Sequence, residues 1–132
     1  NILFTTIRAF AGSTLGAENQ EDNTYFSIPG VGGPGLVAFQ IEGGSMDPVI
    51  KHNDIVVCKS VENLNDIRDN EIYAVRSNGS VWVKYVQKIF NNRGRITRLK
   101  MISANYFDND PFEEEVNETT RLYKVVRKIS NV

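Results

Sequence analysis

The sequence predicts a mostly β domain built from short strands and hairpins, with little helix. Short apolar runs recur along the 132 residues and are separated by turns rich in Gly, Asn and Asp, a pattern typical of all-β domains. No window carries the apolar period of about 3.6 residues that an amphipathic helix requires. The length is that of one domain, large enough to bury a core without a metal or a disulfide.

The N-terminal part is expected to hold two β-prone segments joined by a polar linker. Residues 1–11 are apolar and β-leaning, whereas residues 12–24 are small and polar, as in a surface loop. A short strand is expected over residues 25–28, followed by a glycine-rich loop over residues 30–35.

From residue 36 onward the strand pattern is strong. Asn78-Gly79 lies between two apolar runs, and Asn-Gly is a strong signal for a hairpin turn. His52 falls in a turn and is expected to be exposed and without a role, and the acidic residues 108–115 are expected to form a solvated loop. The expected strands are residues 36–41, 55–58, 72–75, 81–90, 95–102 and 120–129.

The composition excludes several classes of protein. Fifteen basic and sixteen acidic residues give a net charge of -1, which argues against nucleic-acid binding by this chain alone. One cysteine and one histidine exclude an internal disulfide, a cysteine-rich zinc site and a two-histidine metal centre. We therefore expect no metal and no cofactor. No signal peptide or apolar run of about 20 residues is present, which favours a cytoplasmic protein that does not enter a membrane.

One candidate nucleophile stands in the motif Gly43-Gly44-Ser45-Met46-Asp47-Pro48, which follows an apolar strand. Glycines before a serine allow a sharp turn, in which the hydroxyl can project outward with backbone N–H groups beside it. Acyl transfer needs this combination of a nucleophile and oxyanion donors. The motif is not the hydrolase elbow, because Asp47 stands where that elbow has glycine. A glycine-serine turn with no catalytic role is the alternative.

The candidate general base is Lys84, within the apolar strand 81–86. Alternation places Trp82, Lys84 and Val86 on one face. A lysine among apolar neighbours is partly desolvated, which lowers its pKa toward the neutral amine that can act as a base. Ser–Lys pairs are a known variant of serine catalysis. The alternative is a lysine whose amine reaches solvent from a strand edge.

These residues also carry a resemblance to a known family. Residues 39–50 and 53–57, with Ile72-Tyr73-Ala74-Val75, Val83-Lys84 and Ser103-Ala104-Asn105, closely resemble the C-terminal domain of the LexA and phage repressor family. The resemblance implies a β-clip-like, LexA-type fold. It also implies a serine endopeptidase that acts mainly on itself.

The resemblance assigns roles residue by residue. Ser45 matches the nucleophile, Lys84 the general base, and the backbone N–H groups of Gly44 and Ser45 the oxyanion donors. The family typically cuts an Ala-Gly bond upstream of the serine, which points to Ala11-Gly12. The chain departs from the common family pattern at three positions, which are Gly44 in place of an acidic residue, Asn53 in place of glycine and Tyr85 in place of a basic residue.

The resemblance further implies an organisation and partners. Residues 1–24 would be the cleavage-site segment and linker, and residues 25–132 the peptidase and dimerisation domain. A helix-turn-helix domain is expected upstream, through which the protein would bind DNA as a repressor in an SOS-type response. A homodimer is expected, and a recombinase filament is expected as the co-protease. Because an antiparallel sheet must protect its edges, the last strand, residues 122–127, is expected at an edge near the dimer contact.

Two other functions stay open at this point. The first is a trans-acting peptidase related to bacterial signal peptidases, which share the Ser-Met motif and the lysine base but are anchored in membranes. The second is a dimerisation module that does not cleave. The Ala11-Gly12 bond favours self-cleavage over the trans-acting enzyme.

Overall fold

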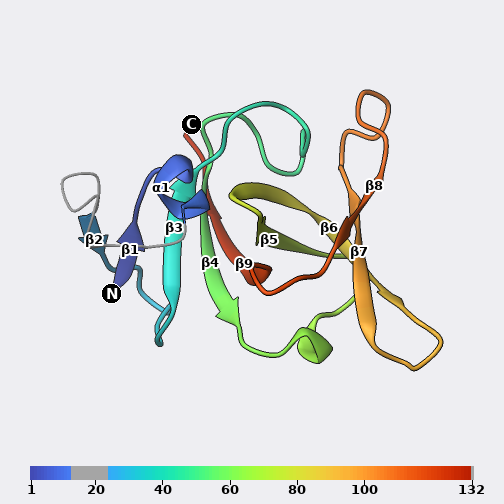
Figure 1. Ribbon diagram of the computed structural model, residues 1–132. Helices are drawn as coiled ribbons and strands as arrows, with labels where there is room; N and C mark the ends of the chain where they lie inside the picture. Colours follow the sequence, from blue (N-terminus) through green and yellow to red (C-terminus); the bar gives the residue numbers. More distant parts are fainter. Residues whose placement is uncertain (13–23, 132) are drawn as a thin grey trace.

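The computed structural model describes residues 1–12 and 24–131. In these residues one nine-stranded mixed sheet has the order β2-β1-β3-β4-β9-β5-β6-β7-β8 (Figure 1). The mostly β class is therefore confirmed. Most of the linker expected over residues 12–24 lies outside the described residues. The strands are β1 (Ile2–Phe4), β2 (Thr24–Phe26), β3 (Leu36–Gln40), β4 (Ile55–Val61), β5 (Glu71–Ser77), β6 (Ser80–Phe90), β7 (Ile96–Ile102), β8 (Phe112–Glu115) and β9 (Arg121–Ile129).

The composition of residues 1–11 predicts β structure, but only part of this segment is a strand. Strand β1 is followed by a short helix, α1 (Ile7–Ala11), and a single 3-10 turn, η2 (Leu64–Asp66), lies between β4 and β5. Thr6 caps α1, because its side-chain oxygen accepts a hydrogen bond of 3.0 Å from the backbone N–H of Ala9. The helix is too short to show a helical period in the sequence, so the capping threonine was the signal that could have predicted it.

The acidic segment after residue 107 is only partly a loop. Its second half forms β8, an edge strand that pairs with β7, and the register places Arg98 opposite Glu115. Arg98 also forms an ion pair with Glu113 at 2.7 Å. Glutamates are unusual in strands, so composition alone predicted a solvated loop here. Their placement opposite basic residues of β7 explains why the strand forms.

Strand β9 was expected at an edge of the sheet, but it is a central strand. It pairs antiparallel with both β4 and β5, whereas β2 and β8 are the edges of the described sheet. The argument that β9 contacts a partner because it is an edge is therefore wrong. The chain hides its last strand in the middle of the sheet, where both backbone edges are satisfied.

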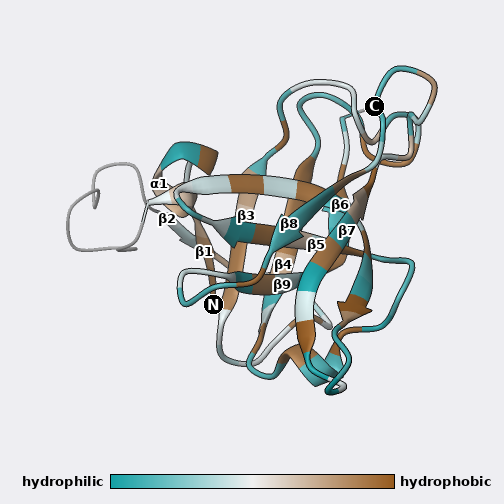
Figure 2. Cartoon of the chain, turned by 45° about the vertical axis from the view of Figure 1, so that its right-hand side comes forward, coloured by the Kyte–Doolittle hydropathy of each residue, from teal (hydrophilic) through white to brown (hydrophobic). Residues whose placement is uncertain are grey.

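Strand β6 joins the two main hydrophobic clusters. Val83 belongs to the cluster that contains Phe10, Phe39 and Met46, whereas Val86 belongs to a second cluster with Tyr73 and the end of β7. Figure 2 shows hydrophobic segments along the central strands and more hydrophilic loops at the ends. Because alternate residues of β6 serve different clusters, a polar residue of this strand can be enclosed within the sheet.

Candidate active site

Ser45 lies half-buried in the turn between β3 and β4. The chain enters this turn through Gly43, whose φ of 85° is in the left-handed region that favours glycine. Asn53, near the end of the loop, has a φ of 73°. Glycine is common at this position in the family that the chain resembles, and asparagine tolerates this region better than most residues.

The serine turn is anchored to the core on both sides of its exposed residues. Met46 and Ile50 are each 2% exposed and belong to the cluster of Phe10 and Phe39. The backbone N–H of Gly43 donates a hydrogen bond of 2.9 Å to Nδ1 of His52. His52 is exposed, as expected, but it is not idle, because its imidazole ties the two arms of the loop together.

The oxyanion donors proposed from the sequence have the required freedom. Within the described part of the chain, the backbone N–H groups of Gly44 and Ser45 donate no hydrogen bond to another protein group. The carbonyl of Gly44 accepts a bond of 3.1 Å from the N–H of Asp47, which closes the turn. Both N–H groups are thus available to an oxyanion that forms beside the serine.

Lys84 is the buried basic group of this region. It lies on β6 opposite Tyr73 of β5, and its side chain is only 7% exposed. Burial lowers the pKa of the Lys84 amine from its usual value. Among the described residues Lys84 has no carboxylate partner, so no opposite charge there opposes the loss of its proton. Trp82 and Val86 both belong to the second cluster, as the predicted alternation requires.

Ser103, which directly follows β7, connects the lysine to the serine turn. Its Oγ accepts a hydrogen bond of 2.8 Å from Nζ of Lys84, and both residues are buried. The next two residues bind the serine turn, because the N–H of Ala104 donates to Sδ of Met46 at 3.4 Å and that of Asn105 donates to the carbonyl of Ser45 at 3.0 Å. Lys84 and Ser45 therefore contact opposite ends of one tripeptide.

The hydrogen bond from Lys84 goes to Ser103 and not to Ser45 in the part of the chain that the structure describes. Catalytic hydrogen bonds often form only when substrate is in place. Ser103 was part of the motif that carried the family resemblance, but it was not assigned a role from the sequence. In the sequence Ser103 is a serine that follows an apolar strand, and this pattern is too common to identify a functional residue.

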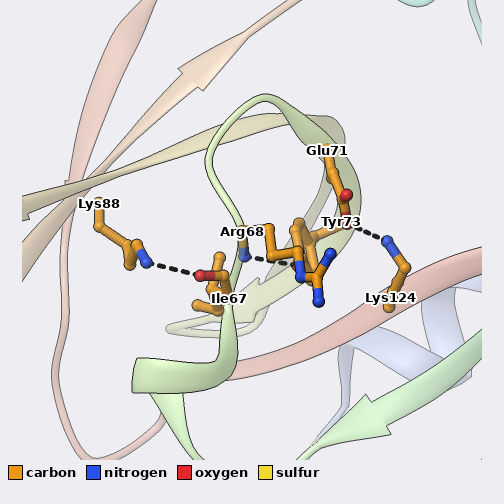
Figure 3. A network of polar contacts seen from close by, with 6 residues as sticks. All are labelled: Ile67, Arg68, Glu71, Tyr73, Lys88 and Lys124. Carbon is orange, nitrogen blue, oxygen red and sulfur yellow. Dashed lines mark hydrogen bonds and ion pairs between the residues drawn. The ribbon is translucent and has the colours of Figure 1, made fainter.

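Tyr73 of β5, which pairs with Lys84 of β6, is itself held by several contacts. Its hydroxyl accepts a hydrogen bond of 2.9 Å from the N–H of Arg68, and Nζ of Lys124 lies 5.4 Å from the centre of its ring. Lys124 also pairs with Glu71 (Figure 3). Tyr73 thus lies on β5 between Lys84 of β6 and Lys124 of β9.

The Ala11-Gly12 bond lies at the C-terminal end of α1, beside Arg76 of β5. Nη1 of Arg76 donates to the carbonyls of Phe10 at 3.2 Å and Gly12 at 3.4 Å. Arg76 is three residues along β5 from Tyr73, the partner of Lys84, which corresponds to about 10 Å along a strand. Phe10 lies in α1 and not in a strand, although the composition of residues 1–11 predicts β structure. It stacks on Phe39 in the core, with ring centres 4.8 Å apart.

None of the helices in residues 1–12 and 24–131 is long and apolar enough to cross a membrane. No curated protein matches the chain. A family model described as Peptidase S24-like matches residues 4–121, which include the serine turn, the lysine strand and the Ala11-Gly12 bond. This match covers most of the chain and confirms the resemblance to LexA and phage repressor domains. The chain belongs to the Peptidase S24-like family of serine peptidases.

Proposed function

We propose that this chain is the regulatory domain of a LexA- or phage-repressor-like transcriptional regulator, and that it cleaves itself at Ala11-Gly12 with Ser45 and Lys84. The observation that carries the proposal is the burial of Lys84 without a carboxylate partner in the described residues, at one end of the tripeptide whose other end binds Ser45. A structural lysine has no reason to occupy this position, because burying an unpaired ammonium is costly.

In the proposed reaction the neutral amine of Lys84 accepts the proton of the Ser45 hydroxyl as Oγ attacks the carbonyl carbon of Ala11. The N–H groups of Gly44 and Ser45 stabilise the oxyanion. Lys84 then gives the proton to the nitrogen of Gly12, the Ala11–Gly12 bond breaks, and Ala11 remains as an ester on Ser45. Water, deprotonated by Lys84, hydrolyses this ester and restores the hydroxyl.

Self-cleavage requires the Ala11-Gly12 bond to leave its position beside Arg76 and reach Ser45. The contacts that hold it are two hydrogen bonds from Arg76 and the packing of Phe10. A protein that alternates between a docked and a bound position, biased by a partner such as a recombinase filament, would cut itself only on demand.

The test is a time course of the purified chain at about pH 7 and about pH 10, on either side of the range in which a desolvated lysine loses its proton. We expect conversion to one shorter product, faster at the higher pH. Ser45→Ala should abolish the conversion, whereas Ser80→Ala, an exposed serine on β6, should cleave like the parent. Cleavage of Ser45→Ala at the parent rate would sink the assignment of the nucleophile. A parent that stays intact at both pH values favours the non-cleaving module.

The homodimer and the DNA-binding role are part of the same proposal. Val126 and Ile129, in the second half of β9, are 39% and 38% exposed, and the neighbouring Lys128 donates to the carbonyl of Val49, which is 39% exposed. The exposed side chains of Val126 and Ile129 support a self-contact through a face of the sheet at β9, not through a backbone edge. Light scattering should show a dimer at high micromolar concentration. Val126→Lys should weaken the dimer, whereas Phe90→Lys, an exposed residue on β6, should not.

A further inference from the structure

We infer that a groove beside the Ala11-Gly12 bond binds the phosphate group of a small molecule through Arg8, Arg76 and Arg121. The groove is open and has a volume of about 520 Å³. Besides the three arginines it is lined by Gly79 and Thr119 and by the Ala11-Gly12 peptide itself. The site is distinct from Ser45 and Lys84, and its ability to bind a ligand does not depend on cleavage.

The charge of this groove is its most unusual property. The whole chain has a net charge of -1, yet the described residues that line the groove include three arginines and no carboxylate. The two ion pairs between described residues are Arg98–Glu113 and Lys124–Glu71, so no ion pair there involves these three arginines. Guanidinium groups gathered without a counter-charge repel one another. An anion between them removes that repulsion, and the site therefore selects for one.

Two of the arginines are already fixed in place by bonds to the backbone. Arg76 donates to the carbonyls of Phe10 and Gly12 and lies 5.7 Å from the centre of the Phe10 ring. Nη1 of Arg121 donates to the carbonyls of Glu118 and Thr120 at 2.9 and 2.8 Å. In each case a single Nη1 atom makes these bonds, so the other donors of the planar fork remain for a ligand. Such preorganised forks match phosphate oxygens well.

The size of the groove indicates more than a bare ion. Its volume falls in the range of about 300 to 1,000 Å³ that is usual for small-molecule sites. A Cβ built on Gly79 would meet no atom within 4 Å, so a ligand can approach the backbone of the β5–β6 turn closely. A phosphate monoester of nucleotide size fits these features, because its dianionic head suits three arginines and its body occupies the rest of the groove.

The experiment uses the Ser45→Ala protein, so that cleavage cannot change the sample. Binding of inorganic phosphate and of adenosine 5′-monophosphate is measured by calorimetry, against sodium chloride at matched ionic strength. We expect saturable binding, weakened about tenfold or more by Arg8→Gln or Arg121→Gln, since each removes a charge-assisted contact. Arg127→Gln, which removes an exposed arginine from the same strand as Arg121, is the matched control and should bind like the parent.

The two probes distinguish the sources of the phosphate group. Tighter binding of the nucleotide identifies an ester as the ligand type, and equal binding identifies free phosphate. The inference is overturned if neither probe binds more tightly than chloride. It is also overturned if Arg8→Gln/Arg121→Gln, shown by circular dichroism to be folded, binds both probes like the parent, which means an adventitious ion only. Because cleavage is measured separately on the Ser45 protein, failure here leaves the proposed peptidase untouched.

Discussion

Nζ of Lys84 lies 2.8 Å from Oγ of Ser103, and both groups are enclosed by the sheet. The amine thus has one neutral partner and no carboxylate among the described residues. A carboxylate would hold the lysine in its charged form, whereas a hydroxyl orients the amine at a much smaller electrostatic cost. In the mechanism that we propose, Ser103 is therefore a positioning residue, which aims the base without fixing its proton.

The first prediction concerns this positioning. Ser103→Ala removes an acceptor that stabilises the charged amine, so the pKa of Lys84 falls further and the pH dependence of cleavage moves to lower pH. The maximal rate should also fall, by about tenfold or more, because the amine is no longer aimed. Ser103→Thr keeps the hydroxyl and should restore most of the rate. A lower rate with an unchanged pH profile would contradict a role through Lys84.

The second prediction links Lys84 to stability. Its pKa is lowered in the folded protein from the usual 10.5, so the unfolded chain binds more protons between the folded value and 10.5. The free energy of unfolding therefore rises with pH across that window. Lys84→Met removes this titration, and its stability relative to the parent should be greatest near neutral pH and decline as pH approaches 10.5.

Urea unfolding of both proteins in the Ser45→Ala background measures this difference. Lys59→Met, which replaces an exposed lysine on β4, is the control and should follow the pH dependence of the parent. A stability difference between Lys84→Met and the parent that is constant with pH would show that Lys84 titrates alike in the folded and unfolded chains. In cleavage assays Lys84→Met should be inactive at every pH, because methionine cannot accept a proton.

The third prediction concerns Asp54, which closes the loop that carries Ser45. Its carboxylate accepts a hydrogen bond of 2.8 Å from the N–H of Lys51, and this bond is the main cause of its lowered pKa. A lowered carboxyl pKa stabilises the fold above its ordinary value of 3.8, and the benefit is lost as pH falls through the folded value.

Asp54→Ala should lower the free energy of unfolding near neutral pH by about 1.5 to 3 kcal/mol, the usual contribution of a hydrogen bond to a charged group. Asp54→Asn keeps an acceptor for Lys51 and should lose less. Both differences from the parent should shrink in acid, where the parent carboxyl is itself protonated. Denaturant titrations at neutral and acidic pH test this, and equal losses at both would exclude the ionised carboxylate as the stabilising group.

The sequence was sufficient for most of the strands because their signals are local. Asn78-Gly79 specifies the β5–β6 turn by its own backbone preference, with φ values of 51° and 80°. Local signals do not specify strand order, which explains why β9 was expected at an edge although it pairs with β4 and β5. The same limit applied to β8, whose glutamates form a strand only because β7 supplies basic partners.

In the candidate site, too, the residues with local signals were predictable from the sequence, whereas the contacts between distant segments were not. Ser45 and Lys84 could be selected from the motif and from the apolar setting of the lysine. Their connection through Ser103 and Asn105 depends on how the end of β7 meets the β3–β4 loop, and no sequence spacing encodes that meeting. The position of Ala11-Gly12 beside Arg76 depends on packing of Phe10 against Phe39, which is equally remote in sequence.

The last prediction is the position of the cut. After incubation at high pH the product should begin at Gly12-Ser13-Thr14-Leu15 and be roughly 1 kDa lighter, an estimate for eleven residues of ordinary composition. Gly12→Glu should block the cut by filling the space beside the attacked carbonyl. The variant should still fold, because Gly12 has a φ of -66° that any residue can adopt. An added Cβ would lie 3.3 Å from the carbonyl oxygen of Ala9, a tight contact that a small shift at the end of α1 relieves. Intact mass and N-terminal sequencing measure the result. The assignment rests on the lack of bulk at Ala11 and Gly12, which lets Ser45 approach this bond. A new N-terminus at any other residue therefore refutes it.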